Sequence, residues 1–231
     1  MKTMNSKTVA TRTVAAGCMV GLMMAAQSAM ACTVGNWSTN SGNVNPGGPD
    51  TSVARYSGLC AMPTPAGETA WVQDNSPGGI NRIRARFYVL NGLDSGQSAV
   101  VYRGFSDTSG GSSLFTVRLA TDGTVRLIDN ETALEVQQTA STPWVSIEID
   151  WSQGSGDGTI SLSVNGQSPA AVNNSLNNAG AALQSVRVGN LLGASGTLNF
   201  DAYESRRTTA VGRLCVGDAD ANASRGIGDL E

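Results

Sequence analysis

Two carboxylates, Glu148 and Asp150, stand two positions apart in the stretch EIDWSQ, residues 148–153. Because alternate residues of a β-strand point to one face, a strand here would present both carboxylates side by side. Retaining glycoside hydrolysis uses two carboxyl groups about 5 to 5.5 Å apart, one as nucleophile and one as acid and base. The alternative is that both are solvent-side carboxylates that form ion pairs with arginines of a neighbouring strand.

Arginines occupy every second position of a second stretch, INRIRARFYVL, residues 80–90. The apolar side chains fall between them, which is typical of a half-buried strand. Guanidinium and phenol groups on such a face could bind the rings and hydroxyls of a sugar, and Tyr203 could join them. The alternative is a solvated charged face whose arginines match acids. The candidate ligand-binding residues are therefore Arg82, Arg84, Arg86, Tyr88, Glu148 and Asp150.

The last fifteen residues, GDADANASRGIGDLE, carry oxygen-bearing side chains at alternate positions. Calcium takes six to eight oxygen ligands, and a loop with side chains at every second residue can wrap one ion. The predicted calcium ligands are Asp218, Asp220, Asn222, Ser224 through its backbone carbonyl, and Asp229. However, Ala223 stands where an EF-hand-type loop has glycine, and the chain ends at Glu231 before an exiting helix. An acidic disordered end, and a calcium site completed by another part of the fold, are the alternatives.

The composition limits the chemistry that is available. The chain has no histidine, which excludes Ser-His-Asp and Cys-His catalysis and most catalytic zinc sites. Any enzyme built on this sequence must therefore work with carboxylates.

The first 31 residues predict a secretory signal peptide. Lys2, Lys7 and Arg12 precede an apolar run of about 13 residues and the cleavage site Ala29-Met30-Ala31. A membrane anchor needs about 20 apolar residues, and acylation of Cys32 is the weaker alternative to cleavage before it. We therefore expect a secreted or cell-surface protein with no membrane span.

The chain after cleavage carries eighteen acidic residues against twelve arginines, a net charge of −6. This charge, without any basic block, argues against nucleic acid and anionic membrane as partners. The three remaining cysteines are Cys32, Cys60 and Cys215. An oxidising compartment favours one disulfide. We expect Cys32 to pair with Cys60 across a loop rich in glycine, asparagine and serine, with Cys60 to Cys215 as the rival.

Short runs with a period of two continue from Val53 almost to Cys215. The pair Asp122-Gly123 and the pair Asn165-Gly166 each predict a tight hairpin turn. Some eleven to thirteen strands and no helix predict an all-β fold, a two-sheet antiparallel β-sandwich of the jelly-roll type. The expected organisation is a signal peptide (1–31), a Gly/Asn/Ser-rich segment (32–52), the β-sandwich domain (53–214) and the acidic tail (215–231).

The order of short motifs gives a resemblance. WVSIEIDW (144–151), VNG (164–166), VRVG (186–189) and FDAYESR (200–206) follow one another as in the laminin-G and pentraxin type of jelly roll. This type belongs to the concanavalin A-like lectin and glucanase superfamily. Related glucanases carry a third carboxylate after the first two, where this sequence has Ser152 or Gln153, so the resemblance implies a missing acid and base. The acidic tail similarly resembles less than half of one dockerin repeat, a calcium-dependent module.

These observations favour a secreted, non-catalytic β-sandwich that acts as a carbohydrate-binding or adhesion module. The partner would be a glycan or a surface protein, and calcium is the one cofactor the sequence suggests. Two alternatives remain, a structural unit of a surface assembly and a glycoside hydrolase acting on β-glucans. The fold resemblance cannot choose between them, because function depends on the site.

Overall fold

Alternating apolar and polar residues produce thirteen β-strands in the computed structural model, which describes residues 33–44, 56–57, 60–167 and 170–214. No α-helix occurs within these ranges, so none of their segments could cross a membrane as a helix. The strands are β1 (Thr39–Ser41), β2 (Met62–Thr64), β3 (Ala70–Asp74), β4 (Arg82–Leu93), β5 (Ser98–Phe105), β6 (Ser113–Ala120), β7 (Thr124–Asp129), β8 (Glu135–Thr139), β9 (Trp144–Ser152), β10 (Ser155–Val164), β11 (Ala171–Asn177), β12 (Ser185–Asn190) and β13 (Gly196–Arg206).

Several predictions fall outside the described residues. They are the signal peptide, the calcium ligands Asp218, Asp220, Asn222, Ser224 and Asp229, and the cysteines Cys32 and Cys215. The pairing of Cys32 with Cys60 therefore stays a prediction, as does calcium binding.

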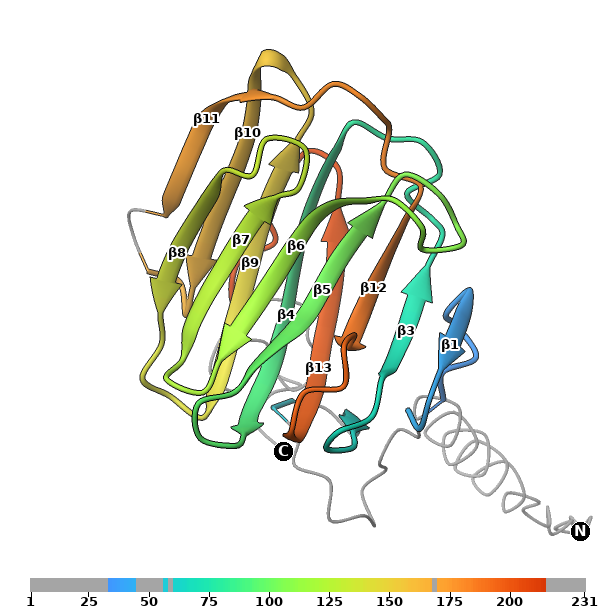
Figure 1. The fold of residues 1–231 in the computed structure, drawn as a ribbon, viewed down its shortest axis with the longest axis vertical. Coiled ribbons are helices and arrows are strands. Elements are labelled where there is room, and N and C mark those ends of the chain that lie inside the picture. The colour runs from blue at the N-terminus through green and yellow to red at the C-terminus, as the bar shows by residue number, and fades with distance from the viewer. Residues whose placement is uncertain (1–32, 45–55, 58–59, 168–169, 215–231) are drawn as a thin grey trace, which may run out of the picture. The chain divides into compact units, whose positions relative to one another are not determined.

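The strands form two antiparallel sheets (Figure 1). The seven-stranded sheet has the order β1-β3-β12-β5-β6-β7-β8, and the six-stranded sheet has the order β11-β10-β9-β4-β13-β2. The predicted all-β, two-sheet antiparallel β-sandwich is confirmed. Neighbours that are distant in the chain, such as β4 between β9 and β13, bring the arginine-rich strand beside the strand with the two carboxylates.

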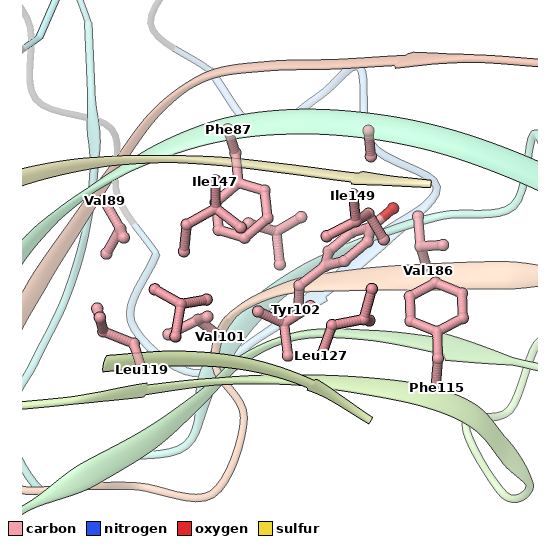
Figure 2. Close-up of a cluster of buried hydrophobic side chains, with 14 of the residues drawn as sticks. Phe87, Val89, Val101, Tyr102, Phe115, Leu119, Leu127, Ile147, Ile149 and Val186 are labelled. Atoms are coloured by element: carbon pink, nitrogen blue, oxygen red, sulfur yellow. The ribbon is translucent and has the colours of Figure 1, made fainter. Parts of the chain in front are cut away.

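The apolar phase of each strand faces the space between the sheets. Phe87, Ile147 and Ile149 of the six-stranded sheet meet Tyr102 and Phe115 of the seven-stranded sheet (Figure 2). The Phe87 and Tyr102 ring centroids lie 5.4 Å apart. The inward positions predicted for β4 and β9 are thus confirmed, because burying one face of a strand fixes which residues face the core.

Both predicted hairpin turns are present. Asn165 and Gly166 have φ angles of 54° and 69° between β10 and β11, the positive values that the predicted turn requires. Between β6 and β7 only the glycine of the predicted pair, Gly123, has a positive φ angle, 82°, and its amide donates to the carbonyl of Ala120. The turn at Asp122-Gly123 therefore differs in type from the prediction, although its position is correct.

A buried carboxylate ties the two sheets together. Asp129, at the end of β7, is fully buried and accepts hydrogen bonds from the Trp151 indole at 3.1 Å and from the Asn178 amide at 2.7 Å. Thr132 donates to its other oxygen from both the backbone and the hydroxyl group. Because these donors satisfy both carboxylate oxygens, the buried charge is stabilised where it would otherwise be costly.

Candidate functional site

The candidate residues gather on the outer face of the six-stranded sheet, the side turned away from the core, which we call the polar face. The register places Arg84 between Asp150 on β9 and Arg206 on β13. It places Arg86 between Glu148 and Glu204 in the next row. All six residues of the predicted set, Arg82, Arg84, Arg86, Tyr88, Glu148 and Asp150, lie on β4 and β9 of this sheet.

Two carboxylates of the polar face pair with arginines. Asp150 accepts from Arg82 at 2.6 Å and from Arg84 at 2.8 Å. The hydrogen bond with Asp150 raises the pKa of Arg82. Glu204 pairs with Arg86 at 3.2 Å and with Arg206 at 2.6 Å. Alternate arginines and acids on neighbouring strands therefore neutralise one another across this face, as the solvated-face interpretation predicts for Asp150.

Glu148 has a different partner. Its Oε1 accepts hydrogen bonds from the backbone amides of Val211 at 2.9 Å and Gly212 at 3.1 Å. These residues belong to the terminal segment, residues 207–214, which follows β13 and returns over the polar face. Arg84 donates to the Thr208 carbonyl and Arg86 to the Gly212 carbonyl. Glu148 thus holds the chain's own backbone in place.

The terminal segment and Tyr56 bury two of the predicted ligand residues. The Tyr88 hydroxyl accepts from the Leu214 amide at 2.9 Å, and the Tyr56 ring stacks on the Tyr88 ring at 3.7 Å. Tyr88 is 0% exposed and Arg86 2% exposed, although the alternating pattern predicts that this side of β4 meets water. That expectation is wrong at these two positions because segments distant in sequence cover the sheet.

Tyr203, which the alternation also assigns to this face, points the other way. A bulge after Asp201, with Ala202 at a φ angle of 49°, shifts the phase of β13. The Tyr203 hydroxyl lies 3.3 Å from that of Tyr102, and burial raises the pKa of Tyr203 to about 12. A bulge of this kind changes the face to which the later side chains of the strand point. The alternation of residues along β13 does not predict it.

An open part of the polar face remains beside the terminal segment. It is a hollow of about 270 Å³, which we call the charged hollow. Asp150 and Arg84, with side chains 21% and 22% exposed, lie beside two serines of β10. The lining residues are Arg84, Glu148, Ile149, Asp150, Ser161, Ser163, Ala170 and Ala210. Ser161 and Ser163 are absent from the predicted set, although their alternation with Ile160 and Leu162 is a signal that could have found them.

Ser152 and Gln153, which stand where a glucanase would have its third carboxylate, form hydrogen bonds with other residues of the fold. The Ser152 hydroxyl lies 2.6 Å from that of Thr159, and the Gln153 amide donates to the carbonyl of Ala181. No cluster of three acidic or cysteine side chains that could hold a metal ion occurs within the ranges the structure describes. The charged hollow therefore offers fixed hydrogen-bond donors and acceptors next to apolar groups such as Ala170 and Ala210.

No known protein family and no curated protein matches the chain. Among solved structures it is similar to the cellulose induced protein Cip1, with 16% identity and a TM-score of 0.51 over 78% of this chain and 92% of that one. The likeness shows the fold, a jelly-roll β-sandwich of the predicted kind. Other similar structures are a legume lectin-like domain from Entamoeba histolytica (8% identity, TM-score 0.44, 72% of this chain and 91% of that one) and alginate lyase PA1167 from Pseudomonas aeruginosa (14%, 0.39, 78% and 90%). At these identities the likeness concerns the fold alone.

Proposed function

We propose that this protein is a secreted, non-catalytic carbohydrate-binding β-sandwich, and that the charged hollow is where it binds a saccharide. The observation that carries the proposal is the pairing of Asp150 with Arg82 and Arg84 beside the hydroxyls of Ser161 and Ser163. Sugar hydroxyls both donate and accept hydrogen bonds. A carboxylate accepts, a guanidinium donates and a serine does both, so the hollow matches such a ligand.

The geometry favours binding because the polar groups are already held in place. Asp150 fixes the two guanidinium groups, so less side-chain freedom is lost when a ligand arrives. The hollow, about 270 Å³, is close to the lower end of the usual size of small-molecule sites, about 300 to 1,000 Å³. A short part of a saccharide chain fits this size better than a long chain does.

The engagement of the carboxylates supports a non-catalytic role. Arg82 donates to both Asp150 oxygens and Arg84 to one of them, and one Glu148 oxygen accepts from two backbone amides. A general acid must carry a proton that it can give away, and two carboxylates fixed as acceptors are poorly suited to this task. Export through the predicted signal peptide, and calcium at the acidic tail, belong to the same proposal.

Affinity electrophoresis of residues 32–231 in gels that contain one polysaccharide each tests the proposal, run once with calcium and once with a chelator. We expect at least one polysaccharide to retard the protein. Ser161→Ala should weaken this binding about 3- to 10-fold, because one hydrogen bond is lost without a change in fold. Ser41→Ala, on the exposed edge strand β1, is the matched control and should bind normally.

Two results would count against the proposal. One is migration that no polysaccharide changes, which would favour a structural unit of a surface assembly. The other is a fall in polysaccharide chain length during incubation with the unmutated protein, since that would show an enzyme.

A further inference from the structure

Three arginines lie side by side on the outer face of the seven-stranded sheet, and we call them the arginine row: Arg187 on β12, Arg103 on β5 and Arg118 on β6. Arg187 is directly opposite Arg103 in the register, and Arg103 is opposite Thr116. Arg118 follows Thr116 by two positions and so lies on the same face. The row thus spans three neighbouring strands, which lie about 4.8 Å apart, with Arg118 displaced by two residues along β6.

None of the three arginines of the row forms an ion pair within the residues that the structure describes, although Asp107 interacts with Arg187 at longer range. Arg103 donates to the Thr116 hydroxyl at 3.3 Å, and Arg187 donates to the Gln73 side chain and the Ser109 carbonyl. Neither they nor Arg118 forms an ion pair within the described ranges, whereas Arg82, Arg84, Arg86 and Arg206 of the polar face all do. The arginines of the polar face are therefore paired with acids, and those of the arginine row are not.

The neighbouring charges confirm this contrast. Burial is the main cause that lowers the pKa of Arg103, and the positive charges of Arg118 and Arg187 lower it further. Burial also lowers the pKa of Arg187. The Asp107 carboxylate acts in the opposite direction on that pKa, but it forms no ion pair with Arg187 and accepts hydrogen bonds from the backbone amides of residues 109–112 of its own loop.

Aromatic contacts hold one end of the row rigid, and a hollow adjoins the other end. The Arg187 guanidinium lies 3.9 Å from the Trp71 ring centroid and 4.9 Å from that of Phe105. Beyond Arg118 a hollow of about 260 Å³ is lined by Ser98, Arg118, Ala120, Asp122, Thr124 and Arg126. Arg126 is opposite Arg118 in the register and lies 3.6 Å from Glu135. The row therefore presents one exposed guanidinium group, that of Arg118, beside the half-buried guanidinium groups of Arg103 and Arg187.

We propose that the arginine row is a second binding site, for a linear anionic polysaccharide whose carboxylate or sulfate groups bind successive arginines. Guanidinium groups match such planar or tetrahedral oxyanions with paired hydrogen bonds. A polysaccharide with one acidic group per sugar ring is favoured over nucleic acid because its charges are more widely spaced, so the net charge of −6 after cleavage repels it less than it repels a duplex. The site is independent of the charged hollow, which lies on the other sheet.

Titration of residues 32–231 with polygalacturonate and with dextran sulfate tests this site and distinguishes carboxylate from sulfate recognition. Neutral dextran and double-stranded DNA are the comparison ligands. We expect at least one anionic polysaccharide to bind, and added salt to weaken the binding as ions are released. Arg118→Gln should weaken it about 5- to 10-fold and Arg103→Gln with Arg118→Gln further, because charge-assisted hydrogen bonds are lost.

Arg213→Gln is the matched control, since Arg213 is also exposed and the net charge changes equally. It should leave the affinity within about twofold. Equal loss in Arg118→Gln and Arg213→Gln, binding of neither polysaccharide, or DNA binding as tight as polysaccharide binding would overturn the proposal. Ser161→Ala should not affect anionic binding, so failure here is distinguishable from failure of the charged hollow.

Discussion

Glu148 and Asp150 lie two positions apart on one face of β9, yet they have unlike partners. Asp150 pairs with arginines of the neighbouring strand, which the alternation on both strands could predict. Glu148 binds backbone amides of the terminal segment, more than 60 residues further along the chain. The local alternation predicts to which face of the sheet a side chain points. It does not predict a contact with a segment that is distant in sequence, because that contact depends on how the rest of the chain folds.

Glu148→Ala tests this structural role. We expect a loss of about 1 to 3 kcal/mol in the free energy of unfolding, because the amides of Val211 and Gly212 lose their acceptor while partly buried. Urea unfolding measures it. Glu135→Ala removes an exposed carboxylate 3.6 Å from Arg126 and should cost less than about 1 kcal/mol. Equal effects of the two substitutions would mean that Glu148 holds nothing in place.

At the scale of elements, the sequence predicts which side chains of β9 face the core. It does not predict the hydrogen bond between Trp151 and Asp129 that joins the two sheets. The alternation in WVSIEIDW places Trp151 inward, and the structure confirms it. Its hydrogen-bond partner, Asp129, belongs to a strand of the other sheet. Strand order is set by packing between distant segments, so no local pattern in the sequence pairs these two residues.

Trp151→Phe should lower the free energy of unfolding by about 2 to 4 kcal/mol. The substitution removes the indole donor to Asp129 and leaves space in the core. Trp144→Phe, on the same strand but half-buried, is the control and should cost clearly less. Thermal unfolding of both variants gives the comparison, and similar losses would show that the Asp129 hydrogen bond contributes little.

At the scale of the whole molecule, the two outer faces differ in how their charges are arranged. Ion pairs with acids neutralise the arginines of the polar face, whereas the arginines of the row form no ion pair among the described residues. The sandwich and its inward residues follow from the period of two. The charged hollow depends on β10 lying beside β9 and on the terminal segment returning over the sheet, and both arise only in the folded chain.

Hydrogen exchange of residues 32–231, with and without the polysaccharide that retards the protein most, tests the central claim most directly. If a neutral saccharide binds in the charged hollow, the backbone amides of β9 and β10 around Asp150 and Ser161 should exchange their hydrogens more slowly. The same protection should be smaller in Ser161→Ala when both proteins are compared at a ligand concentration near the Kd of the unmutated protein. Protection confined to other strands, or no protection with any bound polysaccharide, would contradict the assignment of the charged hollow as the saccharide site.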